Sequence, residues 1–163
     1  HSHRVAEYAV LIAEELGWDK KEIRNLRNAA HLYDIGRIGI PDSILNKPTR
    51  LTEEECAVIK EHTIIGAEIL KNITLIDHVK EVARSHHERY DGKGYPDGLK
   101  GEEIPLYARI IAIADSYDAM KSRKIYRNPL ADEMIYKEIL QSRGKQFDPD
   151  IADDEDGDSD TEF

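Results

Sequence analysis

The sequence predicts an all-α fold, a single helical-bundle domain of about six or seven helices. Three observations lead to this prediction. Apolar residues recur with a helical period through most of the chain. No segment shows a convincing strand pattern, and no internal repeat or coiled-coil pattern is visible. A chain of 163 residues, 40% of them hydrophobic, is also long enough for one domain with its own core.

The first half of the chain predicts two helices and a connector. Residues 5–16 carry one apolar stripe, which predicts the first helix. Asp19 followed by Glu22 is a capping-box pattern, so a second helix should begin there and run to about residue 34. The segment 38–48 (IGIPDSILNKP) has proline and turn chemistry and is predicted to connect this helix to the next.

The second half predicts four further helices and one long loop. Thr52 and Glu55 repeat the capping-box pattern and open a helix that leads to His62 and continues, after a kink, to Leu70. The remaining elements are a helix over 76–87, a loop over 88–103 that holds four glycines and a proline, a strongly apolar helix over 104–120, and a last clear helix over 131–141.

Charge and cysteine content exclude several classes of protein. The formal charge is −10, but residues 150–163 hold eight carboxylates and no Lys or Arg, so the rest of the chain carries only −2. A general nucleic-acid binder would need a basic surface, which is absent here. Cys56 is the single cysteine, so no internal disulfide is possible and a reducing, cytoplasmic location is expected.

The ends of the chain carry three expectations. Residues 153–163 are acidic and are expected to form a disordered tail after a domain over 1–152, with a calcium loop as the weaker alternative. The chain begins at His1 rather than Met, so we expect a fragment of a longer protein with an upstream sensor or receiver domain as a candidate partner. No apolar run reaches membrane-spanning length, and no signal peptide is visible.

Two adjacent histidines predict a metal site. His86 and His87 stand together at the end of a predicted helix, and two neighbouring imidazoles are costly to bury unless a metal holds both. Successive helices supply further imidazoles and carboxylates, so that the candidate ligands are His1, Asp34, His62, His86, His87 and Asp115. This mixture suits iron, manganese or zinc. Taken singly, each His is more often a surface or core residue, and Asp115 alone could be a carboxylate within a helix that pairs with Arg109.

The loop segment HHERYDGKGYP resembles the signature of the HD-GYP family, the cyclic di-GMP phosphodiesterase branch of the HD phosphohydrolase superfamily. Over residues 1–152 the segments YDIGRIGIPDSILNKP, KEHTIIGAEIL, ARIIAIADSYDAM and GKQFDPDIAD resemble the family's blocks in the same order. The resemblance implies two or three divalent ions, iron or manganese, held by the six candidate ligands. It also implies that Gly94, Tyr95 and Pro96 form the loop motif that shapes the substrate pocket.

One departure from the family pattern concerns the His-Asp pair after which the family is named. Tyr33 replaces its histidine. A phenol, with a pKa of about 10, is a poor metal ligand at neutral pH, so one metal should lose a ligand. His31 lies three residues before Asp34 and is a candidate for the missing imidazole, although packing elsewhere is the favoured alternative. His3 and His78 are expected at the surface.

Other residues are candidates for substrate contacts. Arg37 replaces a family lysine and keeps its positive charge, so Arg37 is expected to stabilise charge that develops on the phosphoryl group, with Asp34 as the second catalytic residue. Lys124 and Arg127 are candidate phosphate contacts, with solvated surface as an equal alternative.

The resemblance implies hydrolysis of cyclic di-GMP to linear pGpG, to GMP, or to both. In that reaction a metal-bridging hydroxide attacks phosphorus in line and displaces the 3′ oxygen. Because Tyr33 replaces a ligand, the alternative is a receptor or adaptor that binds cyclic di-GMP, or a diguanylate cyclase partner, without cleavage. A general HD hydrolase acting on mononucleotides is a third hypothesis, which the GYP loop disfavours.

Overall fold

The all-α prediction is confirmed by the computed structural model, which describes residues 1–122 and 132–156. Over these residues the only β pairing is an isolated bridge between Arg143 and Phe147. The α-helices are α1 (Ser2–Glu15), α2 (Lys20–Leu32), α3 (Asp42–Leu45), α4 (Glu53–Lys60), α5 (His62–Leu70), α6 (Val79–Ser85), α7 (Leu106–Lys121), α8 (Asp132–Gln141) and α9 (Pro149–Asp156), with 3₁₀ turns η1 (Ile35–Gly39) and η2 (Gly101–Glu103).

More helical segments are present than the six or seven predicted, for three local reasons. The predicted connector contains the four-residue helix α3. The kink predicted between residues 52 and 70 is a complete break at Glu61, which separates α4 from α5. Finally, α9 was not predicted; it runs to Asp156, four residues past the predicted domain boundary, and residues 157–163 lie outside the described part.

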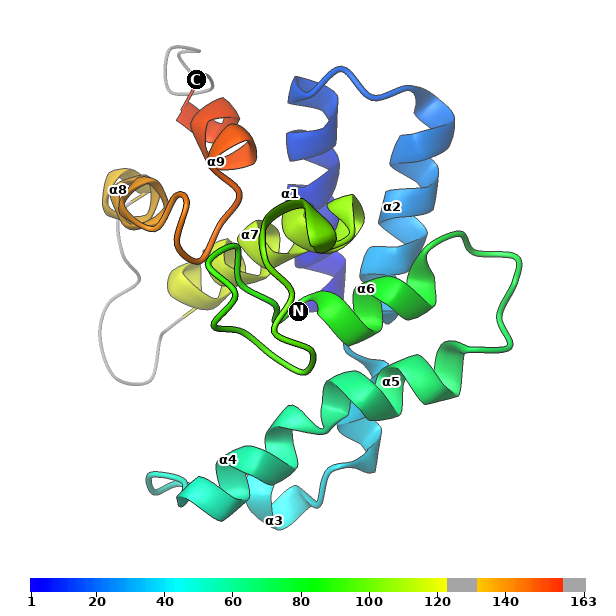
Figure 1. The fold of residues 1–163 in the computed structure, drawn as a ribbon, viewed down its shortest axis with the longest axis vertical. Helices are drawn as coiled ribbons and strands as arrows, with labels where there is room; N and C mark the ends of the chain where they lie inside the picture. The colour runs from blue at the N-terminus through cyan, green and yellow to red at the C-terminus, as the bar shows by residue number, and fades with distance from the viewer. Residues whose placement is uncertain (123–131, 157–163) are drawn as a thin grey trace.

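Helix α7 is the centre of the bundle. Its residues Ile110, Ile111, Ile113 and Ala114 are fully buried, so apolar side chains cover most of its circumference. Figure 1 shows α1 and α2 upright and side by side, α5 and α6 crossing below them, and α8 and α9 on the other side of α7. The N-terminus lies near the middle of this view, and His1 contacts Asp115 and Asp118 of α7.

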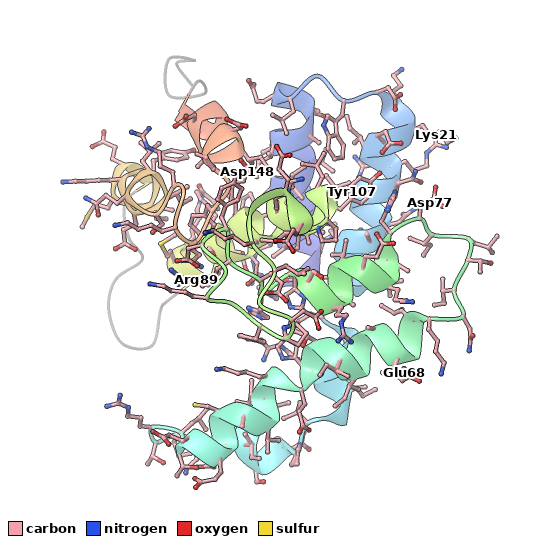
Figure 2. All side chains as sticks on the ribbon, in the orientation of Figure 1. Lys21, Glu68, Asp77, Arg89, Tyr107 and Asp148 are labelled. Atoms are coloured by element: carbon pink, nitrogen blue, oxygen red, sulfur yellow. The ribbon has the colours of Figure 1, made fainter. Side chains whose placement is uncertain are left out.

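The two predicted capping boxes have different outcomes. Thr52 and Glu55 form the complete reciprocal box at the start of α4. At the start of α2, Asp19 accepts a hydrogen bond from the Glu22 N–H, as predicted. The Glu22 carboxylate does not return to the cap, however; it accepts a hydrogen bond from Tyr107 on α7, which lies beside α2 (Figure 2). A tertiary contact has therefore replaced half of a local motif.

The close approach of η1 to α5 positions the functional residues. Helix α2 ends at Leu32, two residues earlier than predicted, and Asp34 is the N-cap of η1. A Cβ atom on Gly36 would lie 1.8 Å from the His62 carbonyl oxygen, so only glycine lets the two backbones pack this tightly. As a result, Asp34 lies directly beside the first turn of α5.

No helix among the described residues is long and apolar enough to cross a membrane. The substrate candidates Lys124 and Arg127 fall in the segment 123–131, outside the described residues.

Candidate metal centre

Three ligand atoms from separate elements converge at the end of α6. Asp34 Oδ1 lies 3.4 Å from His62 Nε2 and 3.6 Å from His86 Nε2, and the two Nε2 atoms are 3.3 Å apart. Each imidazole uses its other nitrogen on a backbone carbonyl: His62 Nδ1 bonds Ile59 O at 2.5 Å, and His86 Nδ1 bonds Ala83 O at 2.9 Å. Because a carbonyl only accepts, both Nδ1 atoms carry the proton and both Nε2 atoms present lone pairs.

This arrangement lacks a positive charge at its centre. Asp34 Oδ1 is buried and has no hydrogen-bond partner, while Asp34 Oδ2 accepts a hydrogen bond of 2.6 Å from Arg37 Nε. Two lone pairs and a carboxylate oxygen that face one another repel unless a cation lies between them. Burial lowers the pKa of His62, so this imidazole stays neutral and able to bind metal. The residues therefore fit a divalent ion.

His87 adds a third imidazole to the group. The ligand nitrogens of His62, His86 and His87 all lie within 4.8 Å of one another. The ring of His87 stacks on Tyr95, with centroids 5.0 Å apart and planes at 15°. Burial, together with the neighbouring histidines, lowers the pKa of His87 to about 3. His87 is thus neutral and held in one orientation.

In a second group, the side chains form hydrogen bonds to one another. Tyr33 donates to Asp115 Oδ1 at 2.5 Å, and His1 Nε2 lies 3.1 Å from the same oxygen. His1 Nδ1 lies 2.5 Å from Asp118 Oδ2, and Arg4 holds the other oxygen of Asp118 at 2.8 Å. Hydrogen bonding to Asp115 raises the pKa of His1 to about 9. Burial alone would raise the pKa of Asp115, but the bonds from His1 and Tyr33 outweigh it and lower that pKa to about 2.

The two groups meet at Tyr33, whose ring packs edge-on against His86 with centroids 4.8 Å apart. The predicted ligand residues are therefore gathered into one region, although only part of the set has a free ligand atom. The predicted alternative for Asp115 is wrong, because Arg109 pairs instead with Asp148 at 2.6 Å.

Three other histidines lie outside the centre, as favoured from the sequence. His31 is exposed and stacks on the exposed His3, with centroids 5.8 Å apart. His78 is exposed and bonds Glu81. His31 therefore does not supply the imidazole that Tyr33 replaces.

The GYP motif packs against the backbone of the histidine pair. A Cβ on Gly94 would lie 2.5 Å from the His87 carbonyl oxygen, and the Tyr95 N–H donates to that same oxygen at 3.3 Å. Pro96 follows a cis peptide bond. The contacts of Gly94 and Tyr95 with the His87 carbonyl accompany the stacking of the Tyr95 ring on His87, so in this structure the motif orients a candidate ligand.

Sequence reasoning missed two carboxylates that hold this region together. Glu88 is 3% exposed and accepts hydrogen bonds from the N–H groups of Asp97 (2.7 Å) and Leu99 (3.1 Å), which pins the loop. Asp118, 1% exposed, orients His1. Glu88 directly follows the histidine pair and Asp118 lies three residues after Asp115, so their spacing was the only available signal.

A cavity of about 330 Å³ opens beside the centre, and His86, His87 and Asp115 form part of its wall. Its cations are Lys60, Lys93 and Arg89. The Lys60 ammonium lies over the ring of Tyr95 at 5.1 Å. Arg89, on the 88–103 loop (Figure 2), is paired with Asp91 at 3.0 Å. An anionic ligand in this cavity would face both positive charge and the candidate metal ligands.

Comparison with known proteins agrees with this arrangement. A family model described as HD domain matches residues 1–151. The chain is 46% identical over 154 residues to a cyclic di-GMP phosphodiesterase of Thermotoga maritima, covering 93% of this chain and 42% of that protein. It is 40% identical over 154 residues to 3'3'-cGAMP-specific phosphodiesterase 2 of Vibrio cholerae, covering 93% of this chain and 30% of that protein. The chain thus spans less than half the length of these relatives.

Among solved structures, Bd1817, described as a HDG"Y"P protein from Bdellovibrio bacteriovorus, superimposes with a TM-score of 0.74 at 22% identity, over 94% of this chain and 49% of that one. At this identity the likeness concerns the fold alone. The family model, the curated relatives and the loop motif together show that the chain belongs to the HD domain family, in its HD-GYP branch.

Proposed function

We propose that this domain is a metal-dependent phosphodiesterase that hydrolyses cyclic di-GMP to linear pGpG, to GMP, or to both. The observation that supports this most directly is the buried, partnerless Asp34 Oδ1, which faces the lone pairs of two imidazoles beside a cation-lined cavity. Relatives named as cyclic di-GMP and 3'3'-cGAMP phosphodiesterases, aligned over nearly all of this chain, support the substrate class.

Asp34, His62 and His86 would hold the first ion, with His87 as a further ligand. Bound divalent ions supply Lewis-acid charge to a phosphoryl oxygen and make a water more acidic. The family resemblance implies two or three ions, iron or manganese. A second position would need Asp115 Oδ1, which at present accepts a hydrogen bond from Tyr33 and lies 3.1 Å from His1 Nε2. The number of ions therefore depends on whether metal displaces these two contacts.

The chain's own side chains would hold and orient the phosphodiester. Lys60 and Lys93 carry positive charge into the cavity and would bind phosphate oxygens. Arg37, predicted to act on the phosphoryl group directly, bonds Asp34 at 2.6 Å, so its first role is to aim Oδ1 at the imidazoles. Tyr95 keeps the plane of His87 fixed by stacking.

The test measures metal content and turnover on the same sample. The protein is purified without oxygen, its iron, manganese and zinc are counted by elemental analysis, and cyclic di-GMP cleavage is followed by chromatography. His62→Ala should lose both bound metal and turnover. His31→Ala is the matched control, because His31 is exposed and outside the centre. Tyr33→His should raise metal content and rate together.

Two results would contradict the proposal. Cleavage that survives complete metal removal would exclude metal-dependent hydrolysis. A fully metal-loaded protein that binds cyclic di-GMP without cleaving it would instead favour the receptor or adaptor role, in which a diguanylate cyclase or an upstream domain is the candidate partner.

A further inference from the structure

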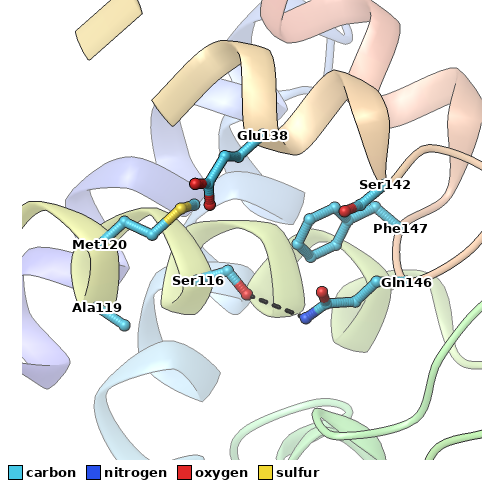
Figure 3. A pocket seen from close by; sticks show the side chains of 7 residues that line it. All are labelled: Ser116, Ala119, Met120, Glu138, Ser142, Gln146 and Phe147. Carbon is cyan, nitrogen blue, oxygen red and sulfur yellow. Dashed lines mark hydrogen bonds between the residues drawn. The ribbon is translucent and has the colours of Figure 1, made fainter. Parts of the chain in front are cut away.

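We propose that a second, smaller cavity next to the metal centre binds a guanine base of the substrate and selects it over adenine. This inference rests on the proposed function and adds the part of the site that recognises the base. The cavity has a volume of about 200 Å³ and lies between α7, α8 and the segment that follows α8 (Figure 3). Its polar side chains are Ser116, Glu138, Ser142 and Gln146, with Met120 and Phe147 as apolar walls.

The two cavities follow each other along α7. Ala112, Asp115 and Ser116 line the cavity at the metal centre, whereas Ser116, Ala119 and Met120 line the smaller one. These two sets are the same helical face displaced by four residues, a rise of about 6 Å. A nucleotide whose phosphate lies at the centre could therefore reach the smaller cavity with its base.

A single hydrogen-bonded pair stands between the cavities. Ser116 and Gln146 line both of them. Gln146 Nε2 lies 3.5 Å from Ser116 Oγ, at the upper limit for a hydrogen bond (Figure 3). A contact this long is weak, so the Gln146 amide can turn to a ligand at little cost. The sugar of a bound nucleotide would then lie beside this pair, and its base would pass the pair to enter the smaller cavity.

The volume suits one base and no more. Pockets for whole drug-sized ligands measure on the order of 300–1,000 Å³. A cavity of about 200 Å³ is smaller than this range, whereas the neighbouring cavity, at about 330 Å³, lies within it. Two cavities of these sizes match a nucleotide. Its charged phosphate would lie near the lysines of the larger cavity, and its flat base would occupy the smaller one.

The chemistry of the smaller cavity favours guanine. Among the described residues, no hydrogen bond or ion pair reaches the Glu138 carboxylate, although it faces this cavity (Figure 3). A carboxylate accepts hydrogen bonds only, and guanine offers it two adjacent donors, N1–H and the N2 amino group. Adenine presents a lone pair at N1, which the carboxylate repels. Gln146 and Ser116 can donate to guanine O6, while Phe147 and Met120, which line the cavity, would give the base apolar contact.

The test compares GMP with AMP on the metal-loaded chain, because neither is cleaved as a phosphodiester. Their dissociation constants are measured by titration calorimetry or ligand-observed NMR for the unmodified protein and for Glu138→Gln. The unmodified protein should prefer GMP, and Glu138→Gln should reduce that preference by about 10- to 100-fold, the worth of a two-point hydrogen-bonded contact. AMP binding should change little.

Glu133→Gln is the matched control. Glu133 is an exposed carboxylate on the same helix, and it does not line the cavity. Circular dichroism checks that both variants are folded, and Ser142→Ala gives a second, smaller perturbation of the same cavity.

The outcomes separate this inference from the proposed function. Cyclic di-GMP turnover by the unmodified chain tests the function alone. The base pocket is refuted if the unmodified chain binds GMP and AMP equally. It is also refuted if Glu138→Gln keeps the full preference, or if Glu138→Gln and Glu133→Gln weaken both nucleotides alike.

Discussion

The hydroxyl of Tyr33 offers the sharpest test of how the candidate ligands divide. Asp34, His62 and His86 present free ligand atoms, whereas Asp115 is held by hydrogen bonds. The side chain of Tyr33 is 1% exposed, and its hydroxyl donates to Asp115 Oδ1. Tyr33→Phe removes this donor and leaves the ring in place. We expect the metal-free variant to be less stable than the unmodified protein, because a buried carboxylate loses a partner. We also expect it to bind metal more tightly, because a metal ion at Asp115 Oδ1 then has to displace only the 3.1 Å contact with His1.

The size of the loss can be worked from the pKa of Asp115. Burial alone would raise this pKa, yet the bonds from His1 and Tyr33 lower it from 3.8 to about 2. That depression corresponds to about 2 kcal/mol. Because two donors share it, removing Tyr33 should cost about 1–2 kcal/mol, at the lower edge of the usual range for hydrogen bonds to charged groups. The midpoint of thermal unfolding should fall by about 2–8 °C for a chain of this length.

The penalty should depend on pH in a defined direction. Asp115 has a lower pKa in the folded than in the unfolded state, so its ionisation stabilises the protein at pH above about 4. This contribution is lost as the pH falls through the folded value of about 2. The difference in free energy of unfolding between Tyr33→Phe and the unmodified protein should therefore be largest at neutral pH and should disappear as the pH falls to about 2.

The assay is urea unfolding in the presence of a chelator, with equal slopes as the check that both proteins unfold alike. Tyr8→Phe is the control, because Tyr8 packs edge-on against Tyr117 and no hydrogen bond to its hydroxyl is found among the described residues. A loss for Tyr33→Phe no larger than that for Tyr8→Phe would refute the reasoning, as would a difference that stays constant down to pH 2.

Three further predictions concern the elements around the centre. Gly36→Ala should destabilise the protein by more than about 3 kcal/mol in urea unfolding, because its Cβ would lie 1.8 Å from the His62 carbonyl; near-normal stability would contradict the packing of η1 on α5. Glu88→Gln should cost about 1–3 kcal/mol and expose the 88–103 loop to proteases, because a charged acceptor for two backbone amides is lost; unchanged proteolysis would count against this. Asp34→Asn should lower metal affinity at least about tenfold while the metal-free stability stays within about 1 kcal/mol, since Oδ1 has no partner to lose and the ion pair of Oδ2 with the partly exposed Arg37 is worth little; a variant that keeps its metal would exclude Asp34 as a ligand.

Much of the fold could be predicted from the sequence because the signals are local. Helical periodicity, the cap at Thr52 and the loop from Glu88 onward depend on neighbours a few residues away, and all three are present in the structure. Element ends were less accurate: the helix predicted over 76–87 covers only Val79–Ser85, which leaves His86 at its cap. Helix α9 was missed because its acidic sequence was interpreted as solvated tail.

The candidate site could be predicted as a set of residues, but its internal pairing could not. Tyr33 was expected only as a missing ligand, yet it donates to a carboxylate 82 residues away. Arg37 was expected on the phosphoryl group, yet it bonds Asp34. Which partner a side chain takes depends on the angle and depth at which helices pack, and that information is spread over the whole core.

By itself, the sequence determined that the chain is an α-helical HD-GYP domain whose histidines and aspartates suit a metal, because helix periodicity and motif spacing are written in neighbouring residues. Only the tertiary structure decided which of those side chains keep a free ligand atom and which are held by hydrogen bonds. The approach of η1 to α5 left Asp34 Oδ1 without a hydrogen-bond partner between two imidazole lone pairs, while the packing of α1 against both α2 and α7 gave Asp115 its hydrogen bonds from His1 and Tyr33. The way the helices pack therefore decides which of these oxygen atoms has a hydrogen-bond partner.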